Sequence, residues 1–140
     1  MKVIAWSQNL TAERAAECGA TLVDKDALFQ ESDIVSIHVR LSERTRGLVG
    51  ARELSLMRSS AYLVNISRGP IVDEAALVDA LQRRSIAGAA LDTFDVEPLP
   101  TDHPLLKLPN TILAPHNGYV TEDCLSAMYS GVVEDIQAFA

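Results

Sequence analysis

Residues 61–74 read AYLVNISRGPIVDE, an apolar run that passes through a polar turn into the beginning of a helix. The run 61–66 predicts a buried strand, and Asp73 is a residue type that caps helices. Arg68 and Gly69 lie on the turn between the two elements. Ligands of open parallel sheets bind just beyond the carboxyl ends of the strands. A guanidinium there can bind a carboxylate through two parallel hydrogen bonds, although a solvent-facing arginine fits this turn equally well.

Short apolar runs separated by helical patterns continue through the rest of the chain. The expected strands are residues 3–6, 21–23, 34–39, 61–66, 87–91 and 110–113. Their apolar residues are continuous rather than alternating, which is typical of strands with both faces covered. Strands that alternate with helices indicate a parallel sheet. We therefore predict an α/β fold built on a doubly wound parallel sheet that is covered on both faces.

Composition limits the functions that this chain of 140 residues can have. Apolar residues make up 48%, which is enough for one domain with its own core. The formal net charge of −7 argues against nucleic acid or an anionic membrane as a partner. Cys18 and Cys124 belong to no CxxC pair, which is typical of reduced thiols in a cytoplasmic protein. We expect a single cytoplasmic domain that binds neither nucleic acid nor membrane.

Four polar residues follow strands and are expected at one edge of the sheet. They are Arg68 after the fourth strand, Asp92 and Glu97 after the fifth, and His116 after the sixth. Successive parallel strands end on the same edge. A histidine exchanges protons near neutral pH, and a carboxylate bonded to one ring nitrogen fixes its tautomer. With Glu97 in that role and Arg68 on a substrate carboxylate, His116 would be the acid or base of carbonyl reduction. The hydride for that reaction must come from a cofactor, because no side chain supplies one.

Several segments resemble the signature segments of the D-isomer-specific 2-hydroxyacid dehydrogenases. They are NISRGPIVDEAALVDAL (65–81), AGAALDTFDVEPLP (87–100) and LAPHNGYVTE (113–122), preceded by the similar segments VIAWSQNLT (3–11) and HVRLSERTRGLVG (38–50). The resemblance implies a Rossmann-like nucleotide-binding domain. It also implies hydride transfer between a nicotinamide cofactor and a small 2-oxo acid or D-2-hydroxy acid. NAD is the implied cofactor, and NADP stays open.

The resemblance also implies roles for individual residues. Arg68 would bind the substrate carboxylate, and Glu97 would pair with His116, the acid/base. Asp92 would meet the nicotinamide carboxamide. No metal is implied. The implied cofactor-binding residues are Ser7, His38, Val39, Ile66, Ser67, Arg68, Asp92, His116 and Gly118.

The sequence departs from the family pattern in three places. The glycine-rich turn that approaches the cofactor pyrophosphate should precede Val3 and is absent. Ser7 stands where an acidic residue usually binds the adenosine ribose, which weakens the case for strict NAD preference. Arg40 replaces the usual proline or apolar residue after the third strand, and we expect it to face solvent.

These departures lead us to expect that residues 1–140 are a partial NAD(P)-binding domain, truncated at its N-terminus by one βα unit. The helix 121–139 would lead toward an absent substrate domain, and the 140 residues alone would be inactive. Two alternatives stay open. One is a non-catalytic remnant that binds cofactor weakly or acts only through association. The other is a receiver-type signalling domain, although Trp6 and Ser7 offer it no acidic cluster.

The missing unit also has a consequence for the sheet. The strand order of this fold is 3-2-1-4-5-6, so residues 3–6 and 34–39 would lie on either side of the absent first strand. Neighbouring strands are about 4.8 Å apart, so these two cannot pair across a gap of one strand. Each would expose an unpaired edge, which favours association. We therefore expect a homo-oligomer.

Overall fold

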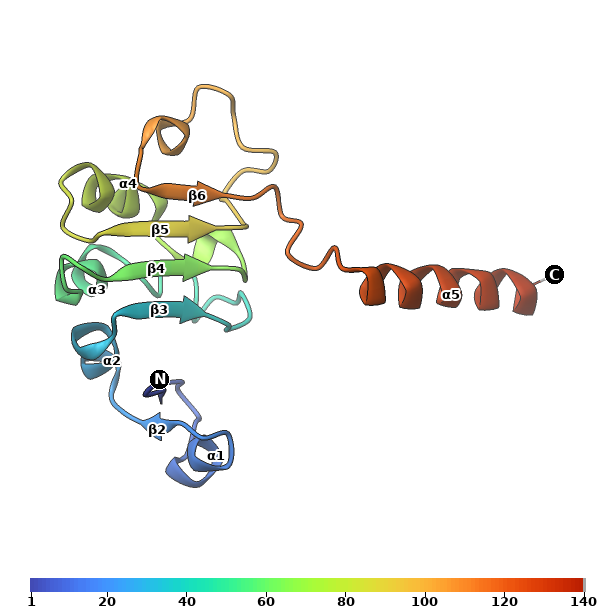
Figure 1. The fold of residues 1–140 in the computed structure, drawn as a ribbon, viewed down its shortest axis with the longest axis horizontal. Helices are drawn as coiled ribbons and strands as arrows, with labels where there is room; N and C mark the ends of the chain where they lie inside the picture. Colours follow the sequence, from blue (N-terminus) through green and yellow to red (C-terminus); the bar gives the residue numbers. More distant parts are fainter. Residues whose placement is uncertain (140) are drawn as a thin grey trace.

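The computed structural model describes residues 1–139, and their centre is a parallel sheet of four strands (Figure 1). Side by side and in chain order, the strands are β3 (Ile34–Ile37), β4 (Tyr62–Asn65), β5 (Gly88–Leu91) and β6 (Thr111–Leu113). The pairing register aligns their last residues, which are Ile37, Asn65, Leu91 and Leu113. The loops that follow the four strands therefore leave from one edge. This arrangement confirms the predicted α/β fold with a parallel sheet.

A second, two-stranded parallel sheet forms the N-terminal part of the molecule. Its strands β1 (Ile4–Ala5) and β2 (Thr21–Leu22) are joined by helix α1 (Ala12–Glu17), which Thr11 caps. Figure 1 shows this unit beyond β3, at the lower end of the sheet. In the described part of the chain β1 and β3 belong to different sheets, as the missing strand predicted. Association through these edges stays a prediction.

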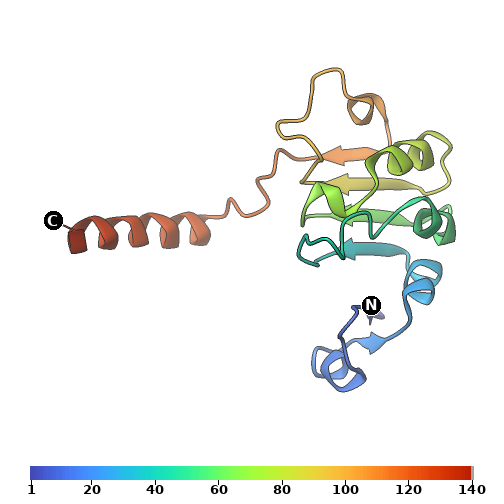
Figure 2. The same ribbon diagram turned by 180° about the vertical axis from the view of Figure 1, so that it is seen from behind.

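Three helices cover one face of the four-stranded sheet. They are α2 (Lys25–Glu31), α3 (Ala51–Leu56) and α4 (Glu74–Gln82), and in Figure 2 the green α3 and yellow-green α4 lie in front of the strands. Asp24 and Asp73 cap α2 and α4 by accepting hydrogen bonds from Ala27 and Ala76. The core lies between these helices and the sheet. Its fully buried apolar side chains are Leu63, Ile71, Leu77, Leu81, Ile86 and Leu105.

The opposite face of the sheet is open, so the prediction of two covered faces is wrong for the described residues. Ile34, Tyr62 and Ile112 point to this face and are 61%, 51% and 74% exposed. Their apolar character suits a covered face, but α2, α3 and α4 all lie on the other side. The apolar runs thus indicate that each strand is suited to a buried position, but they do not indicate which segment covers it.

Helix α5 (Glu122–Phe139) extends away from the rest of the molecule (Figure 1). Thr121 caps it, because its hydroxyl accepts a hydrogen bond from the backbone of Cys124 at 3.2 Å. None of its residues is buried, and its exposed apolar side chains include Met128, Val132 and Ile136. No helix among residues 1–139 is both long enough and apolar enough to cross a membrane.

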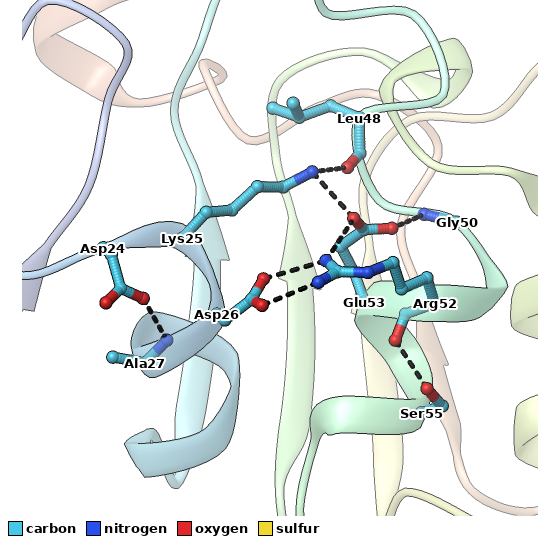
Figure 3. A network of polar contacts seen from close by, with 9 residues as sticks. All are labelled: Asp24, Lys25, Asp26, Ala27, Leu48, Gly50, Arg52, Glu53 and Ser55. Atoms are coloured by element: carbon cyan, nitrogen blue, oxygen red, sulfur yellow. Dashed lines mark hydrogen bonds and ion pairs between the residues drawn. The ribbon is translucent and has the colours of Figure 1, made fainter.

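A polar network joins α2 to α3 (Figure 3). The Lys25 ammonium donates to the Leu48 carbonyl at 2.9 Å and to Glu53 at 2.8 Å, and the Gly50 backbone donates to the same Glu53 carboxylate at 3.0 Å. The ammonium also lies 5.8 Å from the ring centroid of Trp6, within the range of a cation–π contact. Lys25 therefore connects the N-terminal sheet to the helices of the larger one.

We expect Glu53→Ala to lower the free energy of unfolding by about 1–3 kcal/mol, because Lys25 and the Gly50 amide lose a shared, charged acceptor. The Glu53 side chain is only 11% exposed. Arg58→Ala is the control, just beyond the same helix. Its pair with Asp33 is exposed and should be worth at most about 1 kcal/mol. Urea unfolding of both variants measures the difference, and equal losses would contradict the special role of Glu53.

The Glu53 contribution should also depend on pH. Burial is the largest single influence and raises the pKa of Glu53, but hydrogen bonds from Lys25 and the Gly50 backbone together lower that pKa below its usual value. A carboxyl with a lowered folded-state pKa stabilises the fold above its unfolded-state pKa. This stability is lost as the pH falls through the folded-state pKa. The difference between wild type and Glu53→Ala should therefore shrink in acid.

Candidate functional site

The turn after β4 is fixed by a buried amide. Asn65, the last residue of the strand, is fully buried; its side chain donates to the Arg68 carbonyl at 2.9 Å and accepts from the Ser67 backbone at 3.1 Å. The Arg68 side chain is exposed, and one of its nitrogens donates to the Ser67 carbonyl at 2.6 Å. Within residues 1–139 it forms no ion pair. A rigid turn thus presents a guanidinium whose charge is free for an anion.

This turn lies directly against the loop that follows β5. A Cβ atom on Gly69 would come within 2.0 Å of the Phe94 carbonyl carbon and 2.5 Å of the Asp95 nitrogen. Both are backbone atoms, which cannot move aside as a flexible side chain can. Only glycine fits, because the close approach leaves no room for a side chain. The turn that carries Arg68 and the loop after β5 are therefore held in one fixed relation.

Glu97 and His116 form the hydrogen-bonded pair expected from the sequence. The Nδ1 atom of His116 lies 2.6 Å from one carboxylate oxygen of Glu97, and the other oxygen accepts from the Phe94 backbone at 3.0 Å. The bond to His116, the bond from Phe94 and the nearby charge of Arg68 together hold the pKa of Glu97 below its usual value. Glu97 is therefore an anion at neutral pH. Its bond orients the ring and leaves Nε2 as the nitrogen available for proton transfer.

Asp92 supports the backbone on the other side of His116. Its two carboxylate oxygens accept from the backbone nitrogens of Asn117 and Gly118, both at 2.9 Å. His116 itself has φ 54°, in the left-handed region that residues with a side chain rarely adopt. A Cβ atom on Gly118 would lie 2.8 Å from the Asp92 carboxylate. The buried carboxylate therefore holds the strained turn that carries His116.

A pocket of about 280 Å³ opens beside the Glu97–His116 pair. Apart from the pair, its walls are apolar: Phe94, Pro98, Leu99, Leu106, Leu113, Ala114 and Pro115. Few polar groups on an apolar wall are typical of small-molecule sites. The edge of the sheet therefore combines a free guanidinium, an oriented imidazole and a pocket of small-molecule size.

Residues 1–118 match the family described as D-isomer specific 2-hydroxyacid dehydrogenase, NAD binding domain. The chain belongs to this family. A glyoxylate reductase from Thermococcus litoralis is 43% identical over 140 residues, all of this chain and 42% of that protein. A D-3-phosphoglycerate dehydrogenase from Archaeoglobus fulgidus is 39% identical over 136 residues, 97% of this chain and 26% of that protein. The chain thus spans less than half the length of these relatives.

Solved structures of this dehydrogenase family share the fold. The NAD-complexed D-isomer specific 2-hydroxyacid dehydrogenase from Lactobacillus delbrueckii ssp. bulgaricus aligns with a TM-score of 0.82 and 37% identity, over 96% of this chain and 44% of that one. The D-lactate dehydrogenase from Aquifex aeolicus, complexed with NAD and lactic acid, aligns with a TM-score of 0.84 and 31% identity, over 99% and 46%. The chain is thus an NAD-binding domain of 2-hydroxyacid dehydrogenase type.

The dehydrogenase residues implied for cofactor binding lie mainly along the carboxyl edge of β3 and β4. The Ser67 hydroxyl donates to the Val39 carbonyl at 2.5 Å, which joins the two strand ends. Ile66 is 51% exposed, and His38 bonds the hydroxyl of Ser36 at 2.9 Å. This edge offers an exposed apolar side chain next to polar groups, which fits a nicotinamide cofactor.

Of the other residues of the cofactor prediction, Asp92, His116 and Gly118 lie in the loops after β5 and β6. Only one lies in the N-terminal unit. Ser7 follows β1, across the gap from β3. A contact spans this gap, because the Arg44 guanidinium donates to the Gln8 side chain at 3.4 Å. Arg40 is exposed, as expected. The structure thus gathers Arg68, Glu97 and His116 at one place and leaves Ser7 on the smaller sheet.

Sequence reasoning missed the residues that support this candidate site. Asn65 gave a signal, because an asparagine inside an apolar strand must find hydrogen-bond partners. The contact of Gly69 with Phe94 and the bond between Glu74 and His103 at 3.0 Å gave none, because both join segments more than 20 residues apart.

Proposed function

We propose that this chain provides the acid/base side of an active site that interconverts a small 2-oxo acid and a D-2-hydroxy acid with NAD or NADP. The observation that carries the proposal is the 2.6 Å bond between Glu97 and His116 at the edge that also carries Arg68. An arginine, a histidine and an ionised carboxylate are the groups that such a reaction needs.

In this proposal Arg68 binds the carboxylate of the 2-oxo acid and turns its carbonyl toward His116. A nicotinamide cofactor held at the carboxyl edge of β3 and β4 would supply the hydride for the carbonyl carbon. His116 gives the carbonyl oxygen a proton from Nε2, and in the reverse reaction it takes that proton back. Glu97 holds the ring through Nδ1 and fixes its tautomer. Asp92 keeps the turn that carries His116 in place through its hydrogen bonds to the Asn117 and Gly118 backbone.

The names of the relatives suggest the class of substrate. They include glyoxylate reductases and a glyoxylate/hydroxypyruvate reductase B from Escherichia fergusonii, which is 44% identical over 119 residues. We propose a 2-oxo acid of two or three carbons. We also propose that α5 contacts a substrate domain, since the apolar side chains of this helix are exposed. We further propose a cytoplasmic enzyme that forms a homo-oligomer, since β1 and β3 each have an unpaired edge.

Turnover tests this proposal. An enzyme of the relatives' full length that contains this chain (the intact enzyme) should oxidise NADH or NADPH with glyoxylate or hydroxypyruvate. Residues 1–140 alone should not, because half of a cleft cannot hold the substrate in a reactive geometry. Absorbance at the reduced nicotinamide band measures both. An intact enzyme that is folded but inactive with both cofactors would support the non-catalytic remnant instead.

A further inference from the structure

The loop that carries Glu97 is anchored in the core at Phe94 but makes few hydrogen bonds to the rest of the fold. This Glu97 loop, residues 93–103, runs from the end of β5 to the short 3-10 helix η2 (Pro104–Lys107). It contains no regular element, and Val96 within it is 63% exposed. Within residues 1–139, and apart from its bonds to the adjacent η2, the loop forms hydrogen bonds with only two side chains outside it, His116 and Glu74.

Glu74 contacts both ends of the Glu97 loop. It is the first residue of α4, directly after the N-cap Asp73. One carboxylate oxygen lies 3.0 Å from Nε2 of His103, and the other faces the Asp95 backbone nitrogen at 3.5 Å. The Glu74 and His103 side chains are 23% and 17% exposed, so their bond is partly shielded from water. A single carboxylate on a rigid helix thus connects to the beginning and the end of the loop.

The His103 ring has a defined orientation. Its Nδ1 atom accepts a hydrogen bond from the Leu105 backbone at 3.3 Å, so the neutral ring carries its proton on Nε2 and donates it to Glu74. The ring therefore links η2 to α4. Because both of its nitrogens form hydrogen bonds, the His103 ring has less freedom to rotate than a ring held by one surface contact.

We propose that Glu74 is a positioning residue that holds the Glu97 loop so that Glu97 meets His116. The proposal rests on the function proposed for that pair. Gly69 contacts the loop at Phe94 from one side, and Glu74 holds it at Asp95 and His103. The 2.6 Å bond between Glu97 and His116 needs the loop backbone in one place, and a displacement of about 1 Å can reduce a rate by up to roughly 10²-fold.

Glu74 lies close to a second carboxylate, that of Asp95, as well as to its hydrogen-bond donors. Partial burial, the largest influence, and the nearby charge of Glu74 raise the pKa of Asp95, while Arg46 and His103 lower it. Two carboxylates are thus close together at the start of the loop. The two carboxylates repel each other, and the hydrogen bonds that Glu74 accepts from His103 and from the Asp95 backbone nitrogen offset this repulsion.

Nuclear magnetic resonance on the 140-residue chain tests the tether without any turnover. In Glu74→Ala, the hydrogen-bonded amides of Phe94, Asp95 and His103 should exchange hydrogen about tenfold faster, because a charged acceptor that holds the loop is lost. The pKa of Glu97, read from its carboxyl ¹³C shift, should rise toward the usual value. Glu74→Gln should show a smaller change in the same direction, and it serves if the alanine variant does not fold. His103→Gln retains a donor and should preserve most of the wild-type behaviour.

Asp79→Asn is the matched control, because it removes the same charge from an exposed position on α4 that pairs with Arg83. It should leave both readouts unchanged. In the intact enzyme, Glu74→Ala should lower kcat about tenfold with little change in KM for the 2-oxo acid. An unchanged Glu97 pKa and unchanged exchange in Glu74→Ala would overturn the positioning role. An inactive wild-type enzyme with these effects intact would instead overturn the proposed function alone.

Discussion

Replacing His116 by alanine should lower kcat of the intact enzyme by roughly 10²–10⁴-fold, the usual contribution of a positioned proton donor. Glu97 orients the His116 ring at 2.6 Å, and Asp92 holds the turn beneath it, so the imidazole is fixed before any substrate arrives. Alanine at position 116 removes the donor without adding bulk.

Steady-state rates with NADH and glyoxylate, for wild type and His116→Ala, measure this effect. The melting temperature of the variant should stay close to that of wild type, because the His116 side chain is one-third exposed and packs little. A folded variant with nearly normal kcat would contradict the assignment of His116 as the acid/base. In that event the Glu97–His116 bond would be a structural feature of the loop.

Arg68→Lys should lower kcat/KM for the 2-oxo acid by about 10–100-fold, because one hydrogen bond to a charged group is worth about 1.5–3 kcal/mol. Lysine retains the charge but cannot bind a carboxylate with two parallel bonds. KM should therefore rise, and kcat should fall as well, since the carbonyl is no longer aimed at His116. Kinetics over a range of glyoxylate concentrations separates the two parameters.

Arg58→Lys is the control for Arg68→Lys. Arg58 precedes β4, at the opposite end of the strand, and forms an exposed pair with Asp33. The same exchange there should leave kcat/KM unchanged. If Arg68→Lys behaves like the control, the guanidinium faces solvent and does not bind substrate.

The groups that do the proposed chemistry could be predicted from the sequence, because each follows a strand directly. Register places Asn65, Leu91 and Leu113 level, and this alone brings the loops of Arg68, Glu97 and His116 together. Helix starts were equally readable, since Asp24 and Asp73 act within three residues of their own position. Residue type and strand order were therefore enough to predict where most groups of the candidate site lie.

Long-range contacts were beyond the sequence. Nothing near Glu74 indicates that His103 lies beside it, and nothing near Gly69 indicates the Phe94 backbone 25 residues away. Asp92 has the residue type of a cofactor ligand, yet its oxygens accept from Asn117 and Gly118. These features depend on how two loops meet, which periodicity and spacing do not encode.

Coverage of the sheet was predicted wrongly for a related reason. Ile34, Tyr62 and Ile112 have the composition of a covered face, and composition reflects every surface that a strand evolved to bury. Which segment covers it depends on chain connectivity, which the apolar runs do not encode. The exposed face and the exposed side chains of α5 belong to the same question.

We propose that Arg68, Glu97 and His116 position and protonate a 2-oxo acid while the hydride of a nicotinamide cofactor reduces it to a D-2-hydroxy acid. Transfer of deuterium from NADH or NADPH labelled at the nicotinamide C4 to pyruvate, catalysed by the intact enzyme, tests it most directly. We predict D-lactate with deuterium at C2, and loss of this product in His116→Ala and Arg68→Lys in the proportions given above. Label in L-lactate, or D-lactate formed equally well by the His116→Ala enzyme, would contradict the account.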